Sequence, residues 1–271
     1  MLGEERRKQI TNLVYRDGNV SVTELSRLFD VAEVTIRRDL ENLETTGFLK
    51  RIHGGAIINE ALPTIPLFVR ESENQPGKRL VARTAAQHIN DGDTLTLLMS
   101  TTVMQMTELL RPFHNLTVLT NSPELLITLA RNNKDFTLIC SGGTLLIEQM
   151  AFIGPQASEL FDRYEIDKLF FSCRALSKER GIFEINEYNA ELIQRCIRNS
   201  REVFLLMDDG KFNLRASTLI VPWTDIDYLV TNKELDDEWL EVLQQNQVEY
   251  IYAQDHCPLP LNGTEETDAE S

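Results

Sequence analysis

Near the start of the chain, apolar residues recur every three or four positions, which is the period of an amphipathic helix. The pattern predicts three short helices: one that Asp17-Gly18 ends, one that begins at a capping box on Ser21, and one from about Ala32 to Thr45. Residues 48–58 then alternate between apolar and polar side chains, which is typical of a small β-ribbon. Three short helices followed by a ribbon are the elements of a winged helix-turn-helix.

From Leu80 onward, helical patterns alternate with short apolar runs that predict strands. The runs are LTLLM (95–99), LTVLT (116–120), FTLIC (136–140), KLFFSC (168–173), VFLLMD (203–208), YLVTN (228–232) and VEYIYA (248–253). Strands that alternate with helices indicate an α/β domain with a largely parallel sheet. Ligands of such domains bind beyond the carboxyl ends of the strands, so these ends are the place to look for a site.

These patterns divide the chain into four parts. We expect a winged helix-turn-helix over residues 1–58, a linker over 59–79, an α/β domain over 80–253 and a disordered tail over 254–271. The linker contains three prolines and no periodic stripe, and the tail ends in a run of acids. The expected fold class is α/β, with an N-terminal winged helix-turn-helix joined to a larger α/β domain.

Composition excludes several classes of protein. No apolar run is as long as a membrane span, and the first residues, MLGEERRKQ, are charged rather than signal-like. We therefore expect a cytoplasmic protein with no membrane partner. The four cysteines lie 33, 23 and 61 positions apart, and the four histidines are equally scattered. Neither spacing is that of a metal or redox motif, so we expect buried thiols, no metal and no cofactor.

The charge of the chain is unevenly distributed. Residues 1–60 contain 9 Lys and Arg against 10 Asp and Glu, a net charge of −1. Residues 61–271 contain 18 against 32, a net charge of −14. A polyanion can therefore approach the first part of the chain with less repulsion than the rest.

The third expected helix has two faces. Ile36, Leu40 and Leu43 fall on a narrow inward stripe, and Arg37 and Arg38 straddle the opposite surface. In a major groove, one arginine can read a guanine edge while the other holds a phosphate. The expected DNA contacts are Ser21, Thr23, Val34, Thr35, Arg37, Arg38, Asn42, Lys50, Arg51, His53, Gly54 and Gly55.

Each of these features also has a plainer explanation. Two arginines on a helix are more often a solvated face, and Gly54-Gly55 alone is ordinary turn chemistry. Asp39 lies at the edge of the inward stripe, so we expect an internal ion pair or a helix-start contact there rather than a functional role. The conjunction of the basic face with three helices and a ribbon is what favours DNA binding.

Small polar residues and glycines gather where the expected strands end. A loop of hydroxyls that leads into a helix can hold a phosphate, and a lysine can balance the charge. Taken singly, these clusters are ordinary loop and turn residues, but their recurrence at one edge of the sheet favours a small polar or phosphorylated ligand. The expected effector contacts are Ser100, Thr101, Thr102, Asn121, Ser122, Gly142, Gly143 and Lys211.

Spaced matches near the amino end resemble the signature of DeoR-type repressors. They are Arg6, Ile10, Val14, Ala32, Thr35, Ile36, Arg37, Arg38, Asp39 and Leu40, and the segment RIHGGA that follows resembles the wing of that family. The resemblance implies a bacterial transcription regulator that binds operator DNA and senses a phosphorylated sugar. It also implies a second domain similar to sugar-phosphate isomerases.

The second domain resembles the family at several strand ends and departs from it at others. The matches are Asp91-Gly92-Asp93-Thr94, Thr101-Thr102, Thr120-Asn121-Ser122, Gly142-Gly143, Gly154, Gly181, Glu191 and Asp208 with Lys211-Phe212. Leu98 stands where the family has an acid, and Tyr188 and Asn189 replace part of an acidic pair. The resemblance therefore implies a phosphate cradle, with an altered site for the sugar.

The leading hypothesis is a repressor of carbohydrate-metabolism genes that acts as a homodimer or homotetramer, since one winged helix reads few base pairs. Whether the effector releases or strengthens DNA binding stays open, and activation is an alternative to repression. A rival hypothesis is an isomerase-like enzyme with an accessory DNA-binding module. We expect no enzyme, because the acids that isomerisation requires are missing. A scaffold that uses the winged helix for protein contacts is the third reading.

Overall fold

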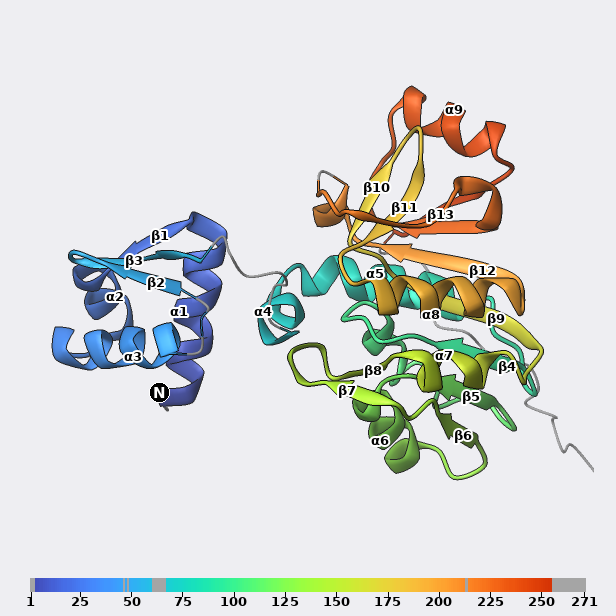
Figure 1. The fold of residues 1–271 in the computed structure, drawn as a ribbon, viewed down its shortest axis with the longest axis horizontal. Coiled ribbons are helices and arrows are strands. Elements are labelled where there is room, and N and C mark those ends of the chain that lie inside the picture. Colours follow the sequence, from blue (N-terminus) through green and yellow to red (C-terminus); the bar gives the residue numbers. More distant parts are fainter. Residues whose placement is uncertain (1–2, 46, 48, 60–66, 213, 255–271) are drawn as a thin grey trace, which may run out of the picture. The chain divides into compact units, whose positions relative to one another are not determined.

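The computed structural model describes residues 3–45, 47, 49–59, 67–212 and 214–254, and Figure 1 shows its fold. The chain divides into two compact units, Met1–Glu73 and Asn74–Ser271. We call them the first and the second unit. The expected tail lies outside the described residues except for its first position, and so do Phe48 and the middle of the expected linker.

The first unit contains the three helices and the ribbon that the sequence predicts. Its elements are α1 (Gly3–Asp17), β1 (Asn19–Ser21), α2 (Val22–Phe29), α3 (Glu33–Thr45), β2 (Leu49–Ile52), β3 (Gly55–Ile58) and α4 (Leu67–Ser72). The strands form one antiparallel sheet in the order β1-β3-β2. The short strand β1 is an addition that the sequence pattern did not reveal.

Local chemistry explains where the helices of the first unit begin and end. The Ser21 hydroxyl accepts a hydrogen bond from the backbone amide of Glu24 (3.1 Å) and donates one to the Glu24 carboxylate (2.8 Å), so Ser21 caps α2 as expected. Asp30 ends α2 in the left-handed conformation, with φ 51°. The apolar stripes of the three helices meet in one buried core, formed by Ile10, Val14, Val20, Val22, Leu25, Ile36, Leu40, Leu43, Leu49 and Ala56.

The second unit is built on a seven-stranded parallel sheet. Its strands are β4 (Thr94–Leu97), β5 (Thr117–Thr120), β6 (Thr137–Cys140), β9 (Ile166–Phe171), β12 (Ser200–Met207), β14 (Tyr228–Thr231) and β15 (Glu249–Tyr252). Each falls within or next to one of the seven apolar runs, and every neighbouring pair is parallel. The α/β prediction is therefore confirmed.

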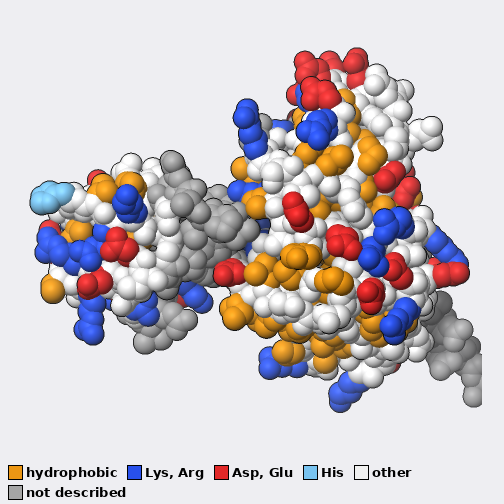
Figure 2. Space-filling view, viewed as in Figure 1, with side chains coloured by type: hydrophobic (Ala, Val, Ile, Leu, Met, Phe, Trp, Pro, Cys, Tyr) orange, Lys and Arg blue, Asp and Glu red, His pale blue; other side chains and the backbone are white. Residues whose placement is uncertain are grey.

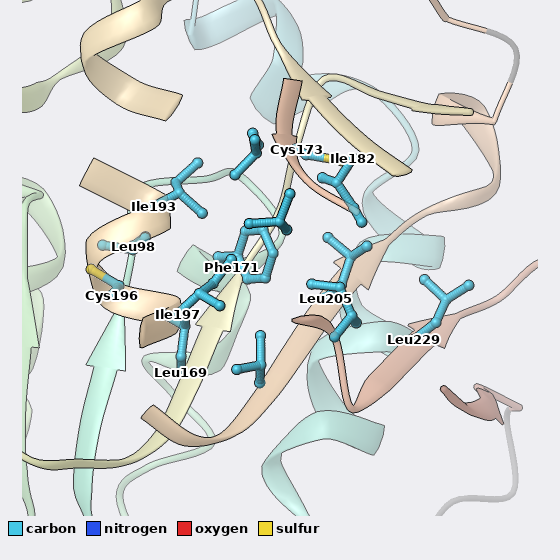
Figure 3. Close-up of a cluster of buried hydrophobic side chains, with 14 of the residues drawn as sticks. Leu98, Leu169, Phe171, Cys173, Ile182, Ile193, Cys196, Ile197, Leu205 and Leu229 are labelled. Carbon is cyan, nitrogen blue, oxygen red and sulfur yellow. The ribbon is translucent and has the colours of Figure 1, made fainter. Parts of the chain in front are cut away.

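Helices cover both faces of this sheet, because successive side chains of a strand point to opposite sides. In β9, Leu169 and Phe171 belong to one buried cluster and Phe170 to the other. The first cluster, part of which Figure 3 shows, packs under α7 (Pro155–Phe161), α8 (Glu187–Arg198) and α9 (Asp237–Gln245). The second packs under α5 (Gln75–Ala86), the 3-10 helix η1 (Val103–Met106) and α6 (Pro123–Asn132).

The order of the strands places the expected ligand site. The sheet runs β15-β14-β12-β9-β4-β5-β6, so the chain winds outward from β4 in one direction and from β9 in the other. In open α/β sheets this reversal is the switch point, where ligands bind beyond the carboxyl ends of the strands. The carboxyl ends of β4 and β9 are followed by Ser100-Thr101-Thr102 and by Ser172.

Five short strands extend the second unit beyond the predicted pattern. A hairpin joins β7 (Thr144–Leu146) to β8 (Ala151–Ile153). A three-stranded antiparallel sheet has the order β10-β11-β13 and consists of β10 (Ala175–Ser177), β11 (Gly181–Glu184) and β13 (Thr218–Val221). The indole of Trp223 donates a hydrogen bond to the Ser177 carbonyl (2.9 Å) and so fixes one side of this sheet.

The described part of the expected linker, residues 59 and 67–79, is largely helical rather than extended. The helix α4 lies inside it, with Leu67 and Val69 buried, and α5 begins at Gln75, five residues before the expected start of the α/β domain. Pro76 stands in the first turn of α5, where proline is tolerated because its missing amide has no helical partner. The described part of the segment is thus largely helical.

Candidate functional site

The candidate DNA-recognition face of the first unit is the outer side of α3. Val34 is 70% exposed, and Arg37, Arg38 and Asn42 are exposed as well, while Ile36 on the opposite side is fully buried. Thr35 lies on the border between the two faces. The helical stripe therefore presents the predicted basic surface to solvent, and Figure 2 shows Lys and Arg side chains gathered on the exposed surface of this unit.

The two arginines of α3 differ in their surroundings. Arg37 forms an ion pair with Glu33 one turn earlier (2.7 Å), and Glu33 also accepts a hydrogen bond from the Thr23 hydroxyl on α2 (3.0 Å). Arg38 has no hydrogen-bond or ion-pair partner among the residues that the structure describes. Its guanidinium, with five donors, is therefore available for a base edge or a phosphate.

The wing contributes further basic groups. Lys50, Arg51 and His53 are exposed. Arg51 lies 3.8 Å from the Glu41 carboxylate and 4.0 Å from that of Glu44, so ion pairs connect β2 to α3. Within the described part of the chain, Lys50 and His53 have no such carboxylate partner. Lys50 and His53 are thus the free polar groups of this ribbon.

The two glycines of the wing are required for different structural reasons. Gly54 has φ +86°, a conformation that L side chains rarely adopt, and it forms the exposed turn. Gly55 is buried, and a Cβ atom there would lie 2.0 Å from the carbonyl oxygen of Val20 in β1. Gly55 is therefore required by the packing of β1 on β3.

Asp39 forms the internal ion pair that its position predicts. Its carboxylate lies 2.6 Å from Arg6 Nε and 3.4 Å from Arg7 Nη1, both on α1. The side chains of Arg6 and Asp39 are only 10% and 5% exposed. Asp39 thus joins α3 to α1 and fixes the orientation of the recognition helix.

In the second unit, three of the predicted effector residues hold the loops at the carboxyl edge. Ser122 Oγ accepts a hydrogen bond from the Leu125 amide (3.2 Å) and so caps α6. Ser100 Oγ accepts one from the Val103 amide (2.9 Å), which holds the loop that leads into η1. Asn121 accepts a hydrogen bond from the Met99 amide (2.8 Å) and donates one to the Phe152 carbonyl (3.3 Å). These side chains fix the shape of the edge.

We define the switch-point site by three of the predicted effector contacts, Thr101, Thr102 and Lys211. It also includes Ser172 and Asp208, which were not among the predicted contacts and which the structure places at Lys211. Lys211 Nζ donates a hydrogen bond to Ser172 Oγ (2.7 Å) and lies 3.9 Å from Asp208 Oδ2. Among the described residues, the buried Thr102 Oγ1 and Asp208 Oδ2 have no hydrogen-bond partner. Buried polar atoms without a partner in the protein are uncommon, and these two atoms can form hydrogen bonds with a bound ligand.

The predicted glycines lie farther along the same edge. Gly142 and Gly143 follow β6, two strands beyond β4, and have φ +63° and +100°. A Cβ atom at Gly143 would lie 2.9 Å from the Ile153 carbonyl oxygen and 3.0 Å from Ala157 Cβ. This glycine is therefore needed for close packing of the edge on β8 and α7.

Asn74 is a residue of this region that the sequence pattern did not reveal. It precedes α5 in the left-handed conformation, with φ 45° and ψ 41°. Its side-chain amide donates hydrogen bonds to Asp208 (3.1 Å) and to Asp209, and Asp209 also accepts one from Asn232 (3.2 Å). Asn74 is the first residue of the second unit, so the switch-point site is connected by hydrogen bonds to the start of that unit.

Cys173 follows Ser172 and is buried. Burial raises the pKa of its thiol to about 12, although the nearby Lys211 acts in the opposite direction. The thiol lies 3.6 Å from the sulfur of Met207. Cys173 is therefore a neutral core residue beside the switch-point site.

Neither a metal site nor a membrane span is found in the described ranges. Within residues 3–45, 47, 49–59, 67–212 and 214–254, no three His, Cys, Asp or Glu side chains are grouped so that they could hold a metal ion. The helices of the same ranges are too short or too polar to cross a bilayer.

A winged helix with an exposed basic recognition helix, joined in one chain to an α/β unit with a polar switch-point site, is the architecture of a DNA-binding regulator with a sensor domain. Comparison with known families agrees. Residues 6–61 match the DeoR-like helix-turn-helix domain, and residues 73–233 match the DeoR C terminal sensor domain. The chain belongs to the DeoR family of transcriptional regulators.

Individual relatives extend over most of the chain. The uncharacterized HTH-type transcriptional regulator YulB of Bacillus subtilis is 36% identical and covers 92% of this chain and 96% of its own length. The lactose phosphotransferase system repressor of Staphylococcus aureus is 31% identical over 89% and 96%. Ribose 5-phosphate isomerase A of Methanocaldococcus jannaschii overlaps 52% of this chain and 55% of its own, with 15% identity and a TM-score of 0.37.

Proposed function

We propose that this regulator represses genes of carbohydrate metabolism and that a small phosphorylated sugar or related metabolite controls its affinity for operator DNA. The observation that carries the proposal is that one chain combines an exposed Arg38 on α3 with a buried Thr102 hydroxyl and a lysine, Lys211, at the carboxyl edge of the sheet. Among the described residues, neither the Arg38 guanidinium nor the Thr102 hydroxyl has a hydrogen-bond partner. A relative with 31% identity is a repressor of a lactose system, which supports the class of genes. We place the protein in the cytoplasm as a homodimer or homotetramer on repeated half-sites.

On the DNA side, the exposed residues of α3 and the wing divide into two kinds. Arg38 and Asn42 offer hydrogen-bond donors for base edges, and Val34 offers methyl groups for contact with thymine. Lys50, Arg51 and His53 are available for phosphates, and Ser21, Thr23, Thr35, Arg37 and Gly54 complete the proposed surface. Gly55, which the sequence predicts as a DNA contact, is buried in the packing of β1 on β3 and is therefore left out of this surface.

On the effector side, Lys211 supplies the positive charge for a phosphate. Thr101 and Thr102 supply hydroxyls for hydrogen bonds to the phosphate oxygens. Ser100, Asn121, Ser122, Gly142 and Gly143 complete the proposed site by holding the loops around it.

Asn74 provides a route from the effector to the first unit. A phosphate that draws Lys211 toward itself weakens the interaction between Lys211 and Asp208, and Asp208 is a hydrogen-bond acceptor of Asn74. Asn74 directly follows Glu73, the last residue of the first unit. A tenfold change in operator affinity requires about 1.4 kcal/mol of coupling, which is comparable to one or two hydrogen bonds.

We infer that the second unit is a sensor and not an isomerase. Leu98, at the position where the family has an acid, is 4% exposed and packs in the core shown in Figure 3. An apolar side chain cannot act as an acid or base. Incubation of the full chain with phosphorylated aldoses and ketoses tests this inference, and turnover would reject it.

The DNA-binding half is tested by Arg38→Ala, with Lys8→Ala as the matched control, since Lys8 is an exposed cation on α1. Fluorescence anisotropy should compare the protein's own promoter DNA with random duplex at several salt concentrations. We expect Arg38→Ala to lose about 10- to 100-fold in specific affinity and the control to lose little, since one good base contact is worth about 1–3 kcal/mol. Unchanged discrimination in Arg38→Ala would reject the recognition face.

The sensor half is tested by Lys211→Ala. A thermal-shift screen of phosphorylated sugars identifies a probe, and operator binding is then measured with and without it. Without the probe, we expect the variant to bind operator with the affinity of the wild type. Addition of the probe should leave the operator affinity of the variant unchanged. An identical response in both proteins rejects the switch-point site.

A further inference from the structure

A hollow of the second unit, apart from the switch-point site, is lined by two arginines. It is a cleft of about 410 Å³ between α5 and the region of η1, and its lining is Arg79, Arg83, Met104, Gln105, Thr107, Glu108 and Leu109. Binding pockets for small molecules have volumes of about 300–1,000 Å³. The cleft is therefore large enough for a metabolite.

The cleft is separate from the switch-point site. Asn74, which contacts Asp208, stands at the start of α5, and Arg83 comes nine residues later near its other end. At a rise of about 1.5 Å per residue, Arg83 is about 13 Å farther along the helix axis. A ligand held by Arg83 would thus occupy a different place from a ligand held by Lys211.

The two arginines of the cleft lack a carboxylate partner. Arg79 donates a hydrogen bond to the neutral amide oxygen of Gln75 (3.3 Å), and Arg83 has no hydrogen-bond or ion-pair partner within the described ranges. The one acid of the lining, Glu108, is already engaged, because its carboxylate pairs with Arg111 and accepts a hydrogen bond from Asn132 (3.0 Å). The positive charge of the cleft is therefore not neutralised by its own lining.

This charge is opposite to that of its surroundings. Residues 61–271 have a net charge of −14, so acids that could pair with the arginines are abundant in the sequence. Arg79 and Arg83 are four residues apart on one helix and lie on the same side of it. Two guanidinium groups in this arrangement can form parallel hydrogen bonds with the oxygens of a phosphate or carboxylate.

We propose that this cleft is a second anion-binding site, which takes a small dianion such as a phosphate ester or a dicarboxylate. Arg79 and Arg83 bind the anionic oxygens, and Met104 and Leu109 provide an apolar wall for the rest of the molecule. The element η1 begins directly after Thr102 and includes Met104 and Gln105 of the cleft lining, so a ligand in the cleft contacts the helix that follows the switch-point loop. Occupation of one site would therefore change the ligand affinity of the other.

The test measures binding of inorganic phosphate and of succinate to the full chain by isothermal titration calorimetry at constant ionic strength in chloride. The first variant is Lys211→Met, which disables the switch-point site and leaves the cleft intact. The second adds Arg79→Gln and Arg83→Gln to it. The control adds Arg131→Gln instead, which removes an exposed arginine of α6 outside the cleft.

We expect Lys211→Met and the Arg131→Gln control to bind at least one of the two anions, and the cleft variant to bind it about tenfold or more weakly. The anion that binds identifies the source as phosphate or carboxylate chemistry. The proposal is overturned if Lys211→Met binds neither anion, or if the cleft variant binds as tightly as the control. None of these outcomes depends on DNA, so failure here leaves the proposed function standing.

Discussion

The buried ion pair between Asp39 and Arg6 yields the most specific prediction about the first unit. Asp39→Ala removes the carboxylate that lies 2.6 Å from Arg6 Nε and 3.4 Å from Arg7 Nη1, and it leaves a guanidinium 90% buried without a counter-charge. Loss of one partner of a buried pair costs about 3–5 kcal/mol. A unit of the size of Met1–Glu73 has a stability of about 4–11 kcal/mol, at about 0.05–0.15 kcal/mol per residue. The variant should therefore lose roughly half of it.

The two units can be followed separately during unfolding by urea. Trp223 and Trp239 both lie in the second unit, so tryptophan fluorescence follows that unit alone, while circular dichroism follows the helices of both. We expect Asp39→Ala to shift part of the dichroism transition to lower urea and to leave the fluorescence transition in place.

Two further variants distinguish charge burial from other causes. Glu33→Ala breaks the ion pair between Glu33, whose side chain is 40% exposed, and Arg37, whose side chain is 59% exposed. Because both partners are exposed, the free energy of unfolding should fall by no more than about 0.5 kcal/mol. Arg6→Met combined with Asp39→Leu replaces both buried charges with apolar groups and should recover most of the loss. If Asp39→Ala is as stable as Glu33→Ala, the buried pair does not hold α3 on α1 and the reasoning fails.

Three other predictions concern the second unit. Asn74→Gly keeps the left-handed backbone but removes the amide, so operator titrations with and without effector should show a smaller effector response; an unchanged response excludes the Asn74 route. Iodoacetamide at pH 8, followed by mass spectrometry, should modify the half-buried Cys140 well before Cys173, whose pKa is about 12, and before the buried Cys196; equal rates contradict the burial argument. Burial lowers the pKa of His88 from 6.5 in the folded protein, so the unfolded chain binds this proton first as the pH falls below 6.5. The free energy of unfolding of the wild type should therefore decrease relative to that of His88→Phe, until the pH passes the lower pKa of the folded state. A difference between the two proteins that does not change with pH refutes this prediction.

The main elements of the fold were predictable because their own side chains define them. The stripe of Ile36, Leu40 and Leu43 has the helical period, and the seven runs of the sheet are continuous apolar segments. Strands such as β1 and β10 are three residues long and are defined by their antiparallel partners β3 and β11. A pattern within three residues cannot identify a partner elsewhere in the chain, so these strands could not be predicted.

The same distinction applies to the sites. The exposure of Arg38 and the internal pairing of Asp39 follow from positions on one helix and were foreseen. The contact of Lys211 with Ser172 joins residues 39 positions apart, and that of Asn74 with Asp208 joins residues 134 positions apart. These contacts depend on the order of strands in the sheet, which the sequence does not show.

The steric role of Gly55 has a consequence for how operators are told apart. A side chain at this position collides with the Val20 carbonyl, and Gly54 needs a backbone that other residues avoid, so the turn tolerates no substitution regardless of the promoter. The two turn glycines are therefore explained by the hairpin itself and carry no information about the target promoter. Discrimination between promoters has to reside in neighbouring side chains that can change without deforming the hairpin.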